Sequence, residues 1–182
     1  MPIRASIFFS YPTQWATEQE EIIARVCAYL EQRGFEPRTL GVTDYDMDAP
    51  LHAVRRLMLE CNGLVTIALR RTHVIEGVKK HPSETDASID VSLDDRWLTT
   101  PWPHIEAAMA FQLGLPILVF REQGVVADGV LEQGVVGTYM PEIPSGNMGD
   151  YFSSPQWTQP MGQWEGRVRR VIEQKGRPPT LY

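Results

Sequence analysis

Apolar residues follow two patterns along this chain: short continuous runs, and longer segments in which they recur every three or four residues. Continuous runs of this length are typical of buried strands, whereas the longer period is typical of helices with one buried face. The runs predict strands at residues 6–11, 35–40, 64–69, 115–120 and 135–140. The periodic segments predict helices over about residues 17–33, 50–61, 103–113 and 164–175.

Local signals support several of these boundaries. Thr17 followed by Glu20 forms a capping-box pattern at the start of the first helix, and Asp48 is placed to cap the second. Pro37 cannot donate a hydrogen bond to a neighbouring strand, so the strand that contains it is expected at an edge of the sheet.

Strands and helices alternate in order, which predicts an α/β fold with a parallel sheet covered by helices on both faces. For a chain of this length we expect a flavodoxin-like three-layer arrangement with strand order 2-1-3-4-5. In such sheets, ligands bind at the carboxyl ends of the strands, where the strand order reverses. The first and third strands meet there, so we expect Ser10 and Tyr11 to flank one cleft together with Arg70 and Arg71.

Two segments depart from this alternation. Residues 72–100 are polar and acidic with little periodicity, and a loop of this length is typically a lid, an oligomer contact or a mobile segment. Alternation over residues 88–93 allows a short strand within it. Residues 141–160 are rich in Pro, Gly and Ser and predict a loop before the last helix. We therefore expect one domain over residues 1–182, with an insert at about 72–100 and a C-terminal helical extension at about 141–182.

The third predicted helix carries the main candidate for chemistry. Pro103 favours the first helical position and keeps the preceding Trp102 extended, which places Glu106 at the end of the first turn. A carboxylate there lies near the positive end of the helix dipole, so we expect it to be ionised at neutral pH. The expected buried stripe excludes Glu106 and consists of Ile105, Ala108, Met109 and Leu113. Glu106 is therefore expected to be exposed at the mouth of the cleft.

Composition and charge narrow the class of protein. The chain has 182 residues, 43% hydrophobic and 22% charged, as in ordinary globular proteins. The net charge is −6 and basic residues occur only in short pairs, so we expect no nucleic acid polymer as partner, although a mononucleotide or dinucleotide needs few basic groups. We also expect no membrane insertion and a cytoplasmic protein, because no apolar run reaches the ~20 residues of a membrane helix. Cys27 and Cys61 fall on predicted buried stripes and are expected to be buried thiols rather than a disulfide or metal pair.

Two short motifs together resemble the TIR domain. The first predicted strand ends in Phe9-Ser10-Tyr11, and Trp102 stands four residues before Glu106 at a helix start, as in the Trp-x-x-x-Glu motif of that family. The resemblance covers about residues 5–120. The passage from Glu106 onward is also similar to nucleoside 2-deoxyribosyltransferases, and both families break or exchange an N-glycosidic bond at a ribose. This chain departs from the TIR pattern at Pro103, where a cysteine is common, and in the longer insert at 72–100.

The resemblance implies a set of site residues. Glu106 corresponds to the glutamate that is essential in the NAD-cleaving TIR domains. Six further residues are candidate substrate contacts: Ser10, Tyr11, Asp46, Arg70, Trp102 and His104. Trp102 would form an aromatic wall, Ser10 and Tyr11 would donate hydrogen bonds, and Arg70 would meet a diphosphate. Asp46 lies in the loop that borders the pocket in TIR domains, and His104 lies on the first helical turn. We expect no metal site and no cofactor, with NAD as a substrate.

These observations lead to one main hypothesis and two alternatives. The main hypothesis is a TIR-like NAD glycohydrolase or cyclase that releases nicotinamide and an ADP-ribose species as a signal in prokaryotic antiviral defence. The enzymatic alternative is a nucleoside or nucleotide 2-deoxyribosyltransferase or N-glycosidase, which a second acidic residue near Glu106 would favour. The other alternative is a non-catalytic TIR adaptor or nucleotide sensor. The family further implies a homo-oligomer or filament and a partner effector. Both enzymatic hypotheses require that Glu106 face a hollow shared with Tyr11.

Overall fold

A parallel sheet forms the centre of the molecule. The computed structural model describes residues 4–79, 91–136, 141–146 and 148–174. All neighbouring strands of the five-stranded sheet run parallel, in the order β2-β1-β3-β8-β9. These strands are β1 (Ala5–Ser10), β2 (Phe35–Arg38), β3 (Leu64–Ala68), β8 (Ile117–Glu122) and β9 (Glu142–Ile143). The order confirms the predicted flavodoxin-like topology, and β2, which contains Pro37, is an edge strand as predicted.

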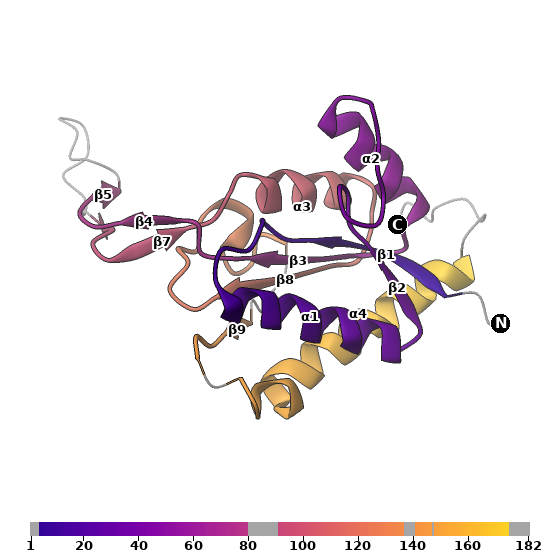
Figure 1. Ribbon diagram of the computed structural model, residues 1–182. Helices are drawn as coiled ribbons and strands as arrows, with labels where there is room; N and C mark the ends of the chain where they lie inside the picture. The colour runs from indigo at the N-terminus through magenta and orange to yellow at the C-terminus, as the bar shows by residue number, and fades with distance from the viewer. Residues whose placement is uncertain (1–3, 80–90, 137–140, 147, 175–182) are drawn as a thin grey trace.

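Helices cover both faces of this sheet, which gives three layers (Figure 1). One face is covered by α1 (Thr17–Gln32) and α4 (Pro155–Gln174). The opposite face is covered by α2 (Pro50–Glu60) and α3 (Trp102–Gln112). Among the described residues, no helix has both the length and the apolar character needed to span a membrane.

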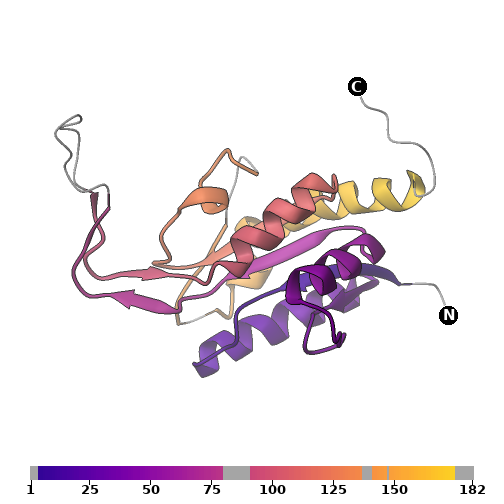
Figure 2. The same cartoon turned by 90° about the horizontal axis from the view of Figure 1, so that it is seen from above.

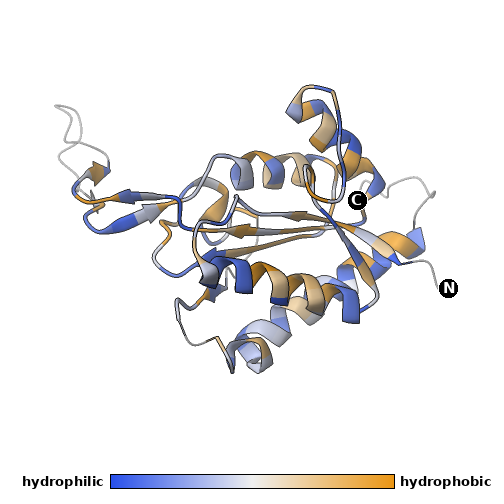
Figure 3. Cartoon of the chain, viewed as in Figure 1, coloured by the Kyte–Doolittle hydropathy of each residue, from blue (hydrophilic) through white to orange (hydrophobic). Residues whose placement is uncertain are grey.

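The alternation of β1 divides its side chains between the two faces. Ile7 and Phe9 belong to the larger core under α1 and α4, whereas Phe8 belongs to the core under α2 and α3. Successive side chains of a strand point to opposite faces, so Ser10 points to the same face as Phe8. In β3 the same rule places Leu64 and Thr66 on that face. The three central strands, β1, β3 and β8, are largely hydrophobic, as their colour in Figure 3 shows. The two hydroxyl side chains are therefore set in an apolar layer beneath α3.

The segment predicted as a long loop is an antiparallel arm, so that prediction is wrong. β4 (Thr72–Val74) pairs with β7 (Arg96–Leu98), and β5 (Val78–Lys79) pairs with β6 (Val91–Ser92). The arm projects from the sheet beyond the end of β3 (Figure 2). The short strand predicted at 88–93 is confirmed for β6, and residues 88–90 lie outside the described ranges. Each strand is too short to show a period, and its partner comes many residues later, so sequence pattern missed the arm.

Aromatic stacking and a buried carboxylate hold the base of the arm. The ring of Trp97 in β7 stacks on Trp15 at 5.8 Å and on His73 at 4.5 Å between centroids. The Arg70 guanidinium lies 5.7 Å from the Trp97 ring, and the Arg70 backbone N–H donates to the buried Glu122 at 2.8 Å. The arm is thus tied both to the loop after β1 and to the end of β8.

The end of the chain differs from the prediction in two places. A short strand lies at Glu142–Ile143, and residues 135–136 of the strand predicted at 135–140 form a turn, while residues 137–140 lie outside the described ranges. The last helix begins at Pro155, inside the predicted loop, and its Trp157 is fully buried. Trp164 and Val168 are buried, whereas Ile172 is exposed. The prolines of this segment predicted a loop because Pro has a low helix propensity. Pro is nevertheless tolerated in the first turn of a helix, which is where Pro155 lies.

Two predicted helix caps are wrong as well. α1 begins at Thr17 itself after Ala16, so Thr17 is a helical residue and not the cap. The nearby backbone N–H of Trp15 is satisfied instead by Gln19, whose Oε1 accepts at 3.2 Å. α2 begins at Pro50, so the residue at its cap position is Ala49 and not Asp48. Neither cysteine forms a disulfide; Cys61 is buried, and Cys27 is only partly buried.

Candidate active site

A cavity of about 380 Å³ opens at the carboxyl end of β1, between α2 and the start of α3. Its volume lies in the range of small-molecule sites. Polar side chains line it from four parts of the chain, namely Ser10, Tyr11, Thr13, Thr39, Arg71, Thr100 and Glu106. Apolar and aromatic residues complete the wall, among them Phe8, Leu40, Val54 and Trp102. The structure therefore brings Ser10, Tyr11, Trp102 and Glu106 together in one hollow, as the prediction required.

The carboxyl group of Glu106 is hydrogen-bonded to the end of β1. The Ser10 hydroxyl donates to Glu106 Oε2, and the Thr66 hydroxyl donates to Ser10 Oγ at 3.2 Å. Only 8% of Glu106 is exposed, and Thr66 is fully buried. Glu106 nevertheless lines the cavity, so its carboxyl group is accessible from one side.

The prediction that Glu106 lies exposed and readily ionised is wrong. Burial raises the pKa of Glu106 to about 7, and the hydrogen bond from Ser10 opposes this rise because it stabilises the charged form. Removal of the carboxyl group from water is the largest cause of this shift. Near neutral pH the group is therefore poised between its acid and its anion.

The cause is the rotation of α3 about its axis. The face packed on the sheet carries Pro103, Glu106, Ala107 and Ala110, whereas Ala108 is exposed. The predicted stripe is wrong at Ala108, whereas Ile105, Met109 and Leu113 are partly buried and the last two pack against the core under α2 and α3. The helix is apolar on nearly all sides, so its period does not fix which face is buried. The small side chains of Ala107 and Ala110 let the helix approach the sheet closely, so the face that carries them is buried.

Aromatic residues flank the entrance. Trp102 is the first residue of α3 rather than an extended residue before it, and it is 41% exposed. Tyr11 is half-buried with its ring 4.9 Å from that of Phe9. Burial raises the pKa of Tyr11, although a hydrogen bond with Thr39 opposes the rise. Tyr11 thus remains a protonated hydrogen-bond donor at neutral pH.

Three predicted contacts lie outside the cavity, so these placements are corrected. Asp46 is paired with Arg56 at 2.6 Å. Arg70 turns toward the base of the arm, where its Nε donates to the Gln123 carbonyl at 2.6 Å. His104 lines a neighbouring cavity of about 460 Å³. Sequence position placed all three near the cleft, but their side chains point elsewhere.

Sequence reasoning expected Arg70 and Arg71 beside the cleft but chose Arg70 as the substrate contact, and it missed Thr66. Arg71, not Arg70, lines the cavity, and it donates to the Thr13 carbonyl at 3.2 Å. Within the described ranges, no carboxylate lies within ion-pair distance of Arg71, so its charge is available to a ligand. Thr66 lies inside an apolar run, and its being the one hydroxyl residue of that run was the signal that could have identified it.

The described part of the chain contains no group of three or more His, Cys, Asp or Glu side chains that could hold a metal ion. The cavity instead offers one carboxyl group, one guanidinium, several hydroxyls and an aromatic rim. These groups suit an organic ligand that carries both a sugar and an anionic group.

Fold and site together define an α/β protein of flavodoxin-like topology with a buried carboxyl group at the switch point of its sheet. Among solved structures, the chain is similar to the TIR domains of the activated Roq1 resistosome, which directly recognises the pathogen effector XopQ. The identity is 10% and the TM-score 0.41, over 93% of this chain and 84% of that chain. No family model and no curated protein matches the sequence.

Proposed function

We propose that this protein is an NAD glycohydrolase or cyclase that cleaves the bond between nicotinamide and ribose. The observation that supports this most is the carboxyl group of Glu106, which faces a cavity of suitable size and is oriented by Ser10. The products would be nicotinamide and a linear or cyclic ADP-ribose species, as a signal in prokaryotic antiviral defence.

The chemistry needs an anion near the ribose. Cleavage of an N-glycosidic bond passes through an oxocarbenium-like sugar, as in glycoside hydrolysis. The ionised form of Glu106 would stabilise that positive charge or take the sugar covalently, and a buried carboxylate does so more strongly than a solvated one. Nicotinamide leaves as a neutral molecule, so no strong general acid is needed.

Other cavity residues have complementary roles in this proposal. Trp102 offers its exposed ring to a base or to nicotinamide, and Tyr11 donates a hydrogen bond. Arg71 would meet a phosphate, in place of the predicted Arg70. Ser10 acts on Glu106 rather than on the substrate, because its one proton is already committed.

The cavity favours this reaction over transfer between deoxynucleosides. A deoxyribosyltransferase would be favoured by a second acidic residue near Glu106. Among the described residues that line the cavity, however, Glu106 is the sole carboxylic acid. Arg71 further favours a phosphorylated ligand over a plain nucleoside. A non-catalytic adaptor remains the outcome if no bond is cleaved.

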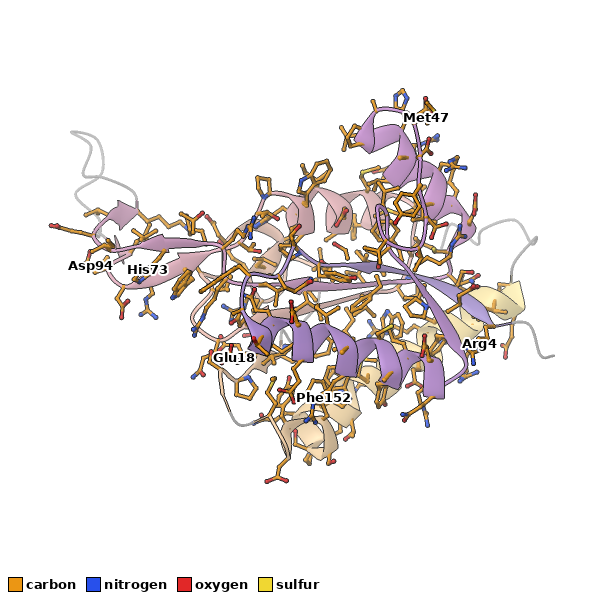
Figure 4. All side chains as sticks on the ribbon, viewed as in Figure 1. Arg4, Glu18, Met47, His73, Asp94 and Phe152 are labelled. Atoms are coloured by element: carbon orange, nitrogen blue, oxygen red, sulfur yellow. The ribbon has the colours of Figure 1, made fainter. Side chains whose placement is uncertain are left out.

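The test compares the wild-type protein with Glu106→Gln on NAD and, separately, on pairs of deoxynucleosides. We expect free nicotinamide from NAD with wild type and a loss of about 10²–10³-fold in rate with Glu106→Gln, the size typical of a lost electrostatic contribution of this kind. Glu18→Gln is the matched control, because Glu18 lies on α1 across the sheet from the cavity (Figure 4). Base exchange between deoxynucleosides would favour the transferase, and silence up to high protein concentration would favour the adaptor.

A further inference from the structure

The hydroxyl of Thr66 stands at the far end of a chain of hydrogen bonds that leads to the candidate catalytic carboxyl group. Thr66 donates to Ser10 Oγ at 3.2 Å, and Ser10 donates to Glu106 Oε2. Thr66 is fully buried in β3, and Ser10 is nearly so at the end of β1. The parallel pairing of the two strands sets Ser10 directly opposite Thr66.

The direction of these hydrogen bonds follows from the number of protons. A hydroxyl group has one proton to donate and two lone pairs that accept. The ionised carboxylate can only accept, so the Ser10 proton points to Glu106 and the Ser10 oxygen is left to accept from Thr66. Without the Thr66 proton, the Ser10 hydroxyl would lose the partner that fixes its rotation.

The second carboxyl oxygen is the one left for a ligand. Within the described ranges, no protein group hydrogen-bonds Glu106 Oε1, whereas Oε2 is held by Ser10. The carboxyl group lines the cavity, and a carboxylate with one oxygen fixed presents the other in a defined direction.

We propose that Thr66 is a positioning residue for the reaction proposed above: its hydroxyl keeps the Ser10 proton on Glu106 Oε2 and so orients Oε1 toward the sugar. This inference rests on the proposed function for its catalytic meaning. The hydrogen-bond chain itself can be tested without substrate.

The surroundings of Glu106 make this chain the main support of its charged form. The loop after β1 contributes Tyr11 to the cavity, the base of the arm contributes Arg71, and α3 contributes His104 to the neighbouring cavity. The residues of β2, α2 and the loops beside them that line the cavity are uncharged. Burial and the Ser10 hydrogen bond are the causes that set the pKa of Glu106. Arg71 lines the same cavity but is not among these causes, so a weaker hydrogen bond from Ser10 should appear directly in the pKa of Glu106.

The experiment uses Thr66→Val, which keeps the shape of the side chain and removes the hydroxyl, with Thr66→Ser as the matched variant that keeps it. The pKa of Glu106 is measured in the full chain without NAD, from the carboxyl carbon resonances of ¹³C-labelled glutamate assigned with Glu106→Gln. We expect Thr66→Val to raise this pKa by about one unit, a tenfold change in the dissociation constant. Thr66→Ser should restore the wild-type value. The pH at which kcat/KM reaches half its plateau should move upward by the same amount.

Ser10→Ala is the reference, because it removes the hydrogen bond to Glu106 outright and should raise the pKa of Glu106 at least as much. If Ser10→Ala raises the pKa and a well-folded Thr66→Val does not, Thr66 has only a structural role and the inference fails. Thr66→Ala answers the same question should Thr66→Val not fold. If neither the wild-type protein nor any variant cleaves NAD, the proposed function fails. The titration still decides whether Thr66 orients Ser10.

Discussion

The burial of Glu106 lowers the stability of the folded protein at neutral and higher pH. A carboxyl group buried to 8% exposure beneath α3 has a pKa of about 7, against an ordinary value of 4.5. The folded protein therefore holds this proton more tightly than the unfolded chain does. As pH rises from 4.5 through 7, the unfolded chain releases the proton first, so folding becomes less favourable over this range. Above pH 7 the full cost of the buried anion is present.

Glu106→Gln should accordingly stabilise the protein in a pH-dependent way. Glutamine keeps the shape and can still accept from Ser10, but it has no charge to bury. We expect little change in the free energy of unfolding at pH 4 and a gain of roughly 3 kcal/mol at pH 8, from about 1.36 kcal/mol for each pKa unit. Denaturant titrations at the two pH values measure the difference. A gain equal at both would mean that the charge of Glu106 is not the cause.

Arg71 should decide whether the site prefers a phosphorylated ligand. Its guanidinium lines the cavity and donates only to the Thr13 backbone among the described residues. We expect Arg71→Gln to raise KM for NAD about tenfold and to leave KM for nicotinamide riboside unchanged. A tenfold change is the lower end of what the loss of a charge-assisted hydrogen bond causes, because Arg71 is exposed. Arg167→Gln on α4, across the sheet, is the control. An equal loss with both substrates would show that Arg71 shapes the cavity and does not recognise phosphate.

At the scale of elements, the base of the arm is held by side chains of the body. Figure 4 shows His73 and Asp94 on the arm, well away from the sheet. The stacking of Trp15, Trp97 and His73, together with the bonds of Glu122, connects β4 and β7 to the ends of β1, β3 and β8. The arm therefore leaves the sheet beside the cavity at a fixed base.

Trp97→Ala should loosen the arm without unfolding the sheet. Each aromatic pair is worth about 0.5–1.5 kcal/mol, so the loss of both pairs should lower local protection by roughly 1–3 kcal/mol. Hydrogen exchange of the amides of β4 and β7, compared with those of β3, measures this. Ile75→Ala is the control, since Ile75 lies on the arm but is 81% exposed. Unchanged exchange in β4 would mean that strand pairing alone holds the arm.

At the scale of the whole molecule, α4 is part of the core and not an appendage. Trp157, Met161, Trp164 and Val168 share one buried cluster with residues of β1, β3, β8 and α1. The predicted C-terminal extension thus supplies much of the apolar cover for one face of the sheet.

Removal of one large side chain from that face should affect the entire fold. Trp157 is fully buried and stacks on Phe120 of β8 at 4.8 Å between ring centroids. We expect Trp157→Ala to lower the global free energy of unfolding by about 3–5 kcal/mol, in one cooperative transition seen by circular dichroism. Ile172→Ala, near the exposed end of α4, should cost little. A transition that melts α4 while the sheet persists would show that α4 folds separately.

The sequence by itself determined the order of the central strands and helices and the edge of the sheet at which the cavity lies. Strand runs and helical periods are local properties of the chain, and the rules for connecting parallel strands then leave few topologies. The same local signals placed Ser10, Tyr11, Trp102 and Glu106 at one edge of the sheet, where the structure brings them together.

Tertiary structure alone decided the burial of Glu106, the choice of Arg71 over Arg70 and the pairing of the arm. Each depends on contacts between segments far apart in the chain. α3 is apolar nearly all round, so only packing on the sheet could fix which face turns inward, and with it the ionisation of Glu106. Thr66 gained its neighbour Ser10 through strand pairing, which no period within either strand encodes.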